Sequence, residues 1–137
     1  MTNWTAEIKY LGNLRVQSQD LKSGEQIITD APTDNHGKGE AFSPTDLMVT
    51  SLANCMITLM GIHAEKNKIL LTECKAKLSK VMQDQPRKIS QITIEFEIKN
   101  HDYTQEQKKI LEKAALECPV ALSLDPEINK KVSFNYL

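Results

Sequence analysis

The 137-residue sequence has almost no excess of charge of either sign. Its 17 lysines and arginines stand against 18 aspartates and glutamates, so no general field would attract nucleic acid, and we expect no nucleic-acid partner. Cysteine is also scarce: the three residues have no close spacing, which argues against both a secreted disulfide framework and a zinc site. The first ten residues lack the basic end and apolar stretch of a signal peptide, so we expect a reducing, cytoplasmic location.

Long hydrophobic runs are missing too, with one exception at residues 47–64. These 18 residues carry no charge and so reach the lower length limit for a membrane span. The run contains threonine, serine, asparagine, glycine and histidine, a mixture that fits a buried globular helix better than a membrane helix. We therefore expect no membrane partner.

What is present is the pattern of a single α+β domain over residues 1–137. Alternating polar and apolar residues predict strands at 4–10, 14–16 and 26–29, which would form a small antiparallel sheet. The segment from Asp30 to Ala41 holds turn formers and little to bury, which predicts an exposed loop that is either mobile or beside the substrate.

A long central helix follows this loop. Ser43 can cap it, Pro44 suits its first position, and Asp46 completes a capping box, so we expect the helix to run from there to about Lys66. Apolar residues cover most directions around its axis, which means that protein must surround it. A chain of this size can hardly do so alone, so we expect a partner subunit to cover part of it.

The second half of the chain predicts a hairpin, two helices and a last strand. Strands are expected over 74–82 and 92–98, and a helix begins near Thr104 with Gln107 in a second capping box. Pro119 should end that helix, because proline lacks the donor N–H. A short helix over 120–124 and a strand over 132–136 complete the pattern.

The three cysteines have different settings. Cys118 precedes Pro119 and would cap the short helix, where unpaired donors favour a thiolate; the alternative is a small apolar residue that ends the preceding helix. Cys55 lies in the middle of the central helix, where core packing is the default and nothing in its own segment activates it. Cys74 lies on the inward face of a strand, and we interpret it as structural.

The histidines offer no base or metal site. His63 follows Cys55 by eight residues on the same helix, about 12 Å along the axis, so the two cannot pair as nucleophile and base. No pattern gives a cluster with metal spacing, and we expect neither a metal nor another cofactor.

Two segments taken together resemble the OsmC/Ohr family. Residues 42–56, FSPTDLMVTSLANCM, resemble the segment in which a proline and an acidic residue open the central helix and a cysteine lies about three turns in. Residues 117–121, ECPVA, resemble that family's second cysteine, which proline also follows. The resemblance implies an OsmC-like fold in which antiparallel sheets pack around a long central helix, in an intertwined homodimer with sites at the subunit interface.

The resemblance also implies a thiol-dependent peroxidase that reduces organic hydroperoxides. By position, Cys55 would be the peroxidatic thiolate and Cys118 the resolving thiol, with a small dithiol as external reductant and no cofactor. Family members hold the thiolate with an arginine and a glutamate. Arg15 lies in the matching hairpin, with a solvated surface residue as the alternative, while the glutamate position is Thr45, with Asp46 beside it.

Because Thr45 stands at the family's glutamate position and Arg15 has an alternative interpretation, two other hypotheses stay open. The first is a non-catalytic protein that binds a small apolar or thiol-containing ligand in the cleft between subunits. The second is a dimeric scaffold with inert core cysteines. Asp46 also has a sufficient structural role in the capping box.

Overall fold

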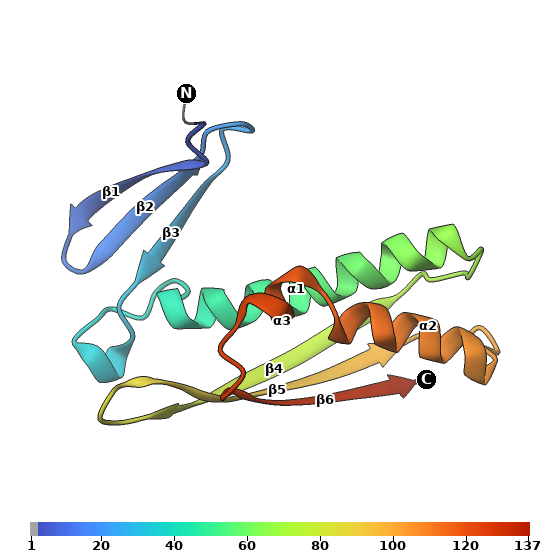
Figure 1. Cartoon of the computed structure of the whole chain (residues 1–137). Helices are drawn as coiled ribbons and strands as arrows, with labels where there is room; N and C mark the ends of the chain where they lie inside the picture. Colours follow the sequence, from blue (N-terminus) through green and yellow to red (C-terminus); the bar gives the residue numbers. More distant parts are fainter. Residues whose placement is uncertain (1–2) are drawn as a thin grey trace. The chain divides into compact units, whose positions relative to one another are not determined.

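Residues 3–137, the part of the chain that this computed structural model describes, form six strands, three α-helices and a short 3-10 helix (Figure 1). In chain order they are β1 (Ala6–Gly12), β2 (Arg15–Asp20), β3 (Gln26–Asp30), η1 (Thr33–Asn35), α1 (Pro44–Lys66), β4 (Cys74–Gln83), β5 (Lys88–Ile98), α2 (Gln105–Leu116), α3 (Pro119–Ser123) and β6 (Asn129–Tyr136). The chain divides into two compact units, one up to Leu47 and one over Met48–Leu137, and each is described by itself.

The first unit contains the predicted small antiparallel sheet, in the order β1-β2-β3. The cross-strand pairs Ile8 with Ser18 and Ser18 with Ile27 put these residues on one face, together with Tyr10. Ile8 is 69% exposed and Tyr10 is 64% exposed. This sheet therefore has one apolar face that its own unit does not bury.

The segment after β3 differs from the predicted exposed loop at its first residue. Asp30 ends β3 and is only 1% exposed, because it pairs with Arg15 across the sheet, a contact that local turn chemistry does not reveal. The loop returns to the same strand, since the Asp30 N–H donates to the carbonyl of Phe42 at 3.0 Å. Within the loop, Gly37 passes so close to Ala31 that a Cβ on Gly37 would lie 1.7 Å from the Ala31 carbonyl oxygen.

Helix α1 has the predicted bounds. The Asp46 N–H donates to Ser43 Oγ at 3.0 Å, and Pro44 occupies the first turn, as the capping pattern indicates. Its length and composition would suffice to cross a membrane, a test that core helices also pass. Here its buried residues join the core of the second unit; they are Val49, Leu52, Ala53, Met56, Met60 and Ala64.

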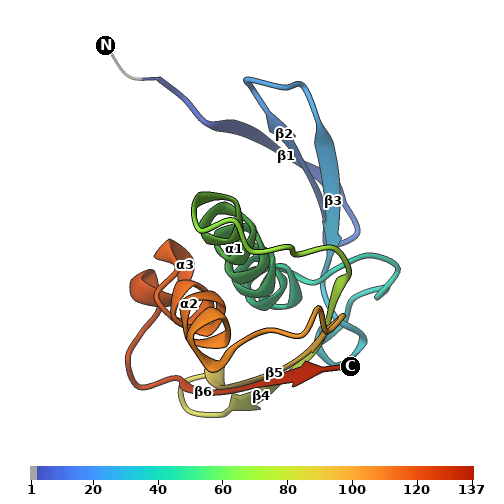
Figure 2. The same cartoon turned by 90° about the vertical axis from the view of Figure 1, so that its right-hand side faces the viewer.

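The second unit is a sheet in the order β4-β5-β6 with α1 and α2 side by side on one face (Figure 2). The predicted hairpin β4-β5 is antiparallel, and the inward residues of β5 are all fully buried, namely Ile92, Ile94, Phe96 and Ile98. The α+β fold class is confirmed, but one expectation is wrong: β6 runs parallel to β5. The reason is the connection, since α2 and α3 carry the chain back along the sheet before β6 begins.

Helix α2 shows both halves of the predicted capping box. The Gln107 N–H donates to Thr104 Oγ1 at 3.1 Å, and the Thr104 N–H donates to Gln107 Oε1 at 2.9 Å. Helix α3 begins at Pro119, one residue before the predicted start. The junction between α2 and α3 fixes the position of Cys118.

Candidate active site

The second unit brings Cys55 and Cys118 together. Helix α1 presents Cys55 as a half-buried side chain, and the α2–α3 junction presents Cys118 as a fully buried one. Both side chains pack in the same apolar cluster, and they lie close enough for Cys55 to raise the pKa of Cys118. All three cysteines are free thiols. Two residues that the sequence places far apart thus form one contact.

The backbone around Cys118 follows from its sequence. Pro119 disfavours helical geometry in the residue before it, and Cys118 is accordingly extended, with φ −68° and ψ 153°. Pro119 then takes the first position of α3, and the Cys118 carbonyl accepts the N–H of Leu122 at 3.0 Å. Cys118 is therefore the N-cap of α3, as the sequence predicts.

The charge state of Cys118 differs from the expected one. Burial raises the pKa of Cys118 above its ordinary value, and the interaction with Cys55 raises it further. The backbone N–H groups of Ala121 and Val120 lower the pKa, as expected at a helix start, but burial outweighs them. The expectation of a thiolate at Cys118 is therefore wrong in its net direction. Cys118 is therefore a protonated thiol at neutral pH.

Cys74 lies apart from this pair on β4. It is half-buried, and burial raises the pKa of its thiol. Burial is the main cause that raises the pKa of the nearby Tyr103 and Tyr136 phenols, and Cys74 adds a smaller contribution to both. An apolar strand position with a protonated thiol agrees with the structural interpretation of Cys74.

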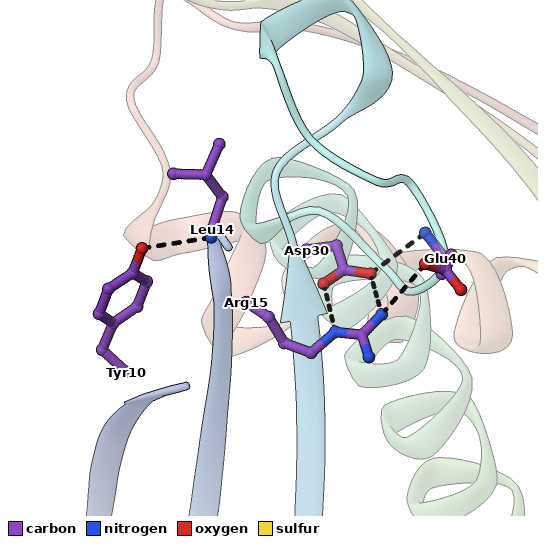
Figure 3. Close-up of polar contacts among 5 residues, drawn as sticks. All are labelled: Tyr10, Leu14, Arg15, Asp30 and Glu40. Carbon is purple, nitrogen blue, oxygen red and sulfur yellow. Dashed lines mark hydrogen bonds and ion pairs between the residues drawn. The ribbon is translucent and has the colours of Figure 1, made fainter. Parts of the chain in front are cut away.

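Arg15 lies in the first unit and holds a carboxylate that the sequence did not suggest (Figure 3). Its Nε donates to Asp30 Oδ1 at 2.7 Å and its Nη2 donates to Asp30 Oδ2 at 2.8 Å. Glu40 Oε1 lies 3.7 Å from the same Nη2. The hydrogen bonds from Arg15 are the main reason that the pKa of Asp30 lies below its usual range. Arg15 is therefore partly exposed but held in place by an ion pair.

The residues at the start of α1 make local contacts. Ser43 Oγ lies 3.3 Å from Thr45 Oγ1 and accepts the N–H of Asp46. Thr45, at the position of the family's glutamate, therefore belongs to the cap of the helix. Within residues 3–137 there is no group of three or more His, Cys, Asp or Glu residues that could hold a metal ion.

The family model described as OsmC-like protein matches residues 37–133. Among curated proteins there is no match. A solved structure from Psychrobacter arcticus 273-4, named for osmotic stress induction and the detoxification response, is 44% identical over 98% of both chains, with a TM-score of 0.93.

Two more distant structures share the fold. The organic hydroperoxide resistance protein OsmC from Legionella pneumophila is 19% identical, with 98% of this chain and 99% of that chain covered and a TM-score of 0.75. An organic hydroperoxide resistance protein from Vibrio cholerae, with captopril in one of its active sites, is 18% identical, with 100% and 95% covered and a TM-score of 0.72. At such identities the likeness shows the fold alone.

Proposed function

This chain belongs to the OsmC-like protein family, and from that premise we propose that it is a thiol-dependent peroxidase that reduces organic hydroperoxides. The observation that carries the proposal is that Cys55 and Cys118, far apart in the sequence, lie close together in the second unit, near enough for Cys55 to raise the pKa of Cys118. Two thiols in contact can pass from peroxide reduction to disulfide formation without a large movement.

The proposed reaction has three steps. The Cys55 thiolate attacks one oxygen of the O–O bond; that bond breaks, the substrate leaves as an alcohol after taking up a proton, and Cys55 becomes a sulfenic acid. The Cys118 thiol then displaces the hydroxyl as water and closes the disulfide. An external dithiol returns both cysteines to thiols and is itself oxidised to a disulfide.

The different surroundings of the two cysteines support this assignment of roles. Cys55 is only half-buried and is the more accessible of the two, whereas Cys118 is 0% exposed. Burial and the Cys55 contact raise the pKa of Cys118, so this thiol is protonated at neutral pH. A protonated, covered thiol suits the resolving step better than the attack on peroxide.

Charged residues of the first unit and of the helix start complete the proposal. Arg15 would hold the Cys55 thiolate by its positive charge, as the arginine does in the family. Asp46, next to Thr45 at the start of α1, would be the second charged group of the site. The proposed roles of Arg15 and Asp46 rest on the family resemblance and not on the contact between Cys55 and Cys118.

The proposed protein is an intertwined homodimer. Apolar side chains that the chain leaves exposed support a partner subunit, since burying them is favourable. On the first sheet they include Ile8 and Tyr10, and on α1 they include Met48 at 41% and Ile62 at 42%. We place the dimer in the cytoplasm, where a reducing environment keeps the cysteines as free thiols.

Peroxide consumption tests the proposal. Wild type with cumene hydroperoxide and dihydrolipoamide should consume peroxide, and Cys55→Ser should abolish the dithiol-dependent rate. Cys74→Ser is the matched control and should retain it, because Cys74 lies outside the pair. Equal rates for wild type and Cys55→Ser would overturn the mechanism.

A second candidate function is binding without catalysis. The captopril in the Vibrio cholerae relative favours it, since captopril is a thiol-containing ligand, and so does Thr45 at the glutamate position. A pure binder would take up captopril equally well in wild type and Cys55→Ser, and neither protein would consume peroxide.

A further inference from the structure

We propose that Asp30 is a positioning residue: its carboxylate holds the Arg15 guanidinium in one orientation and ties it to the loop over residues 31–42. The inference rests on the proposed function, in which Arg15 acts on the Cys55 thiolate. Asp30 is not among the residues that the family resemblance assigns to the site.

The geometry of the pair fixes the guanidinium in its plane. Two parallel bonds, Nε to Oδ1 at 2.7 Å and Nη2 to Oδ2 at 2.8 Å, form a bidentate fork (Figure 3). The fork uses the Nε–Nη2 edge of Arg15 and leaves Nη1 outside it. A single bond would let the guanidinium swing on its long stem, whereas two bonds remove that freedom.

Burial makes the pair asymmetric. The Asp30 side chain is 1% exposed, whereas that of Arg15 is 29% exposed. A carboxylate out of contact with water must have donors around it, and Asp30 has three: Arg15 Nε, Arg15 Nη2 and the Glu40 N–H at 3.1 Å. The buried Asp30 carboxylate therefore anchors the Arg15 guanidinium. The exposed part of Arg15 is then available to interact with a further group.

The same carboxylate connects Arg15 to the loop. Asp30 Oδ2 accepts both Arg15 Nη2 and the N–H of Glu40, which lies near the end of the loop. Glu40 adds a weaker contact of its own, at 3.7 Å from Nη2 with a side chain that is 64% exposed. A shift of the loop would therefore move the donors of Asp30 and, with them, the orientation of Arg15.

Gly37 offers a way to move the loop without changing either charged residue. A Cβ there would lie 1.7 Å from the Ala31 carbonyl oxygen, a backbone atom that cannot turn aside. Gly37→Ala must therefore displace the loop next to Asp30. Arg15, Asp30 and Glu40 all keep their side chains in this variant.

The competing interpretation is a purely structural ion pair between β2, β3 and the loop. Activity alone does not separate the two, because a destabilised protein also loses activity. The pH profile of Cys55 does, since a structural role would not change the reactivity of the thiol in the folded protein. Circular dichroism at the assay temperature verifies that each variant is folded.

The experiment compares full-length wild type, Asp30→Asn, Asp30→Glu and Gly37→Ala. The control is Asp20→Asn, at the opposite end of β2, where the carboxylate accepts only local donors such as the Ser23 N–H at 3.2 Å. The readouts are kcat and KM for cumene hydroperoxide, and the rate at which iodoacetamide alkylates Cys55 as a function of pH, followed on the Cys55 peptide by mass spectrometry.

For Asp30→Asn we expect kcat/KM to fall about tenfold or more, since a misplacement of about 1 Å can cost a factor of about 100. The alkylation profile should shift to higher pH. Asp30→Glu, which keeps the charge, should recover most of the loss. Gly37→Ala should shift both readouts in the same direction as Asp30→Asn, and Asp20→Asn should match wild type.

Two results would overturn the inference. One is a folded Asp30→Asn variant whose alkylation profile matches that of Asp20→Asn; the pair would then be structural only. If Asp30→Asn does not fold, the same result in a folded Gly37→Ala variant would overturn the inference. The other is faster alkylation in Asp30→Asn, which would mean that Asp30 weakens Arg15. Failure of the proposed function is distinct, because it appears as equal peroxide rates in wild type and Cys55→Ser.

Discussion

Replacing Cys118 by serine changes one buried atom and removes the proposed resolving thiol. The side chain is 0% exposed, so the hydroxyl would be out of contact with bulk solvent. Burying an unpaired hydroxyl costs about 1–3 kcal/mol, and a hydrogen bond to Cys55 would return about 0.5–1.5 kcal/mol of this. We expect Cys118→Ser to lower the free energy of unfolding by about 1–2 kcal/mol, which a folded domain of this size survives.

The chemical effect of Cys118→Ser should be far larger than its effect on stability. A thiol held against its partner acts at an effective concentration of about 10⁵ M or more, whereas a dithiol in solution is present at about 10⁻³ M. These concentrations differ by a factor of about 10⁸, so even if little of this advantage is realised, the step that consumes the Cys55 sulfenic acid should slow by at least about a hundredfold without Cys118. One equivalent of peroxide should then add one oxygen to Cys55 without forming a disulfide.

The assay combines two measurements on Cys118→Ser. Guanidinium denaturation under reducing conditions gives the change in the free energy of unfolding, and intact mass after peroxide gives the oxidation state. Cys118→Ala is the control for the hydroxyl, since it removes the thiol without adding a polar group. Turnover of Cys118→Ser at the wild-type rate, or a disulfide between Cys55 and Cys74, would refute the reasoning.

Two further predictions concern stability. Thr104→Ala removes the capping box of α2 and should cost about 1 kcal/mol in urea denaturation, whereas Thr104→Ser should keep most of the capping energy; equal loss in both would mean that the hydroxyl does not cap the helix. Burial, followed by the 2.9 Å hydrogen bond to Glu112, raises the pKa of Tyr136, so its contribution to stability is complete below the unfolded value of about 10 and is lost as the pH rises through the folded value. Tyr136→Phe should therefore lose less stability than wild type between about pH 10 and pH 11, and an equal loss would contradict this.

Local signals in the sequence predicted much of the fold. Ser43 and Pro44 mark the start of α1, and Thr104 with Gln107 marks the start of α2, because caps depend on side chains within a few residues. The alternating apolar residues of β5 predicted which of its faces is buried, because alternation is also a local signal. The pairing of Cys55 with Cys118 came from the family resemblance, and the structure brings the two into contact.

The features that the sequence did not reveal depend on partners far along the chain. Alternation in β6 identifies a strand but not its direction, which the helical connection after β5 sets. Asp30 has the composition of a turn residue, and its burial follows from its position opposite Arg15 in the strand register. Cys118 occupies the expected cap, but the burial that dominates its pKa comes from packing.

The most direct test of the thiol pair is the product of a single oxidation. Reduced wild type receives one equivalent of cumene hydroperoxide without a dithiol, is then alkylated, and is analysed by intact mass and peptide mapping. The account predicts the loss of two hydrogens, a Cys55–Cys118 disulfide and an alkylated Cys74. Alkylation of all three cysteines, with the peroxide unconsumed, would contradict it.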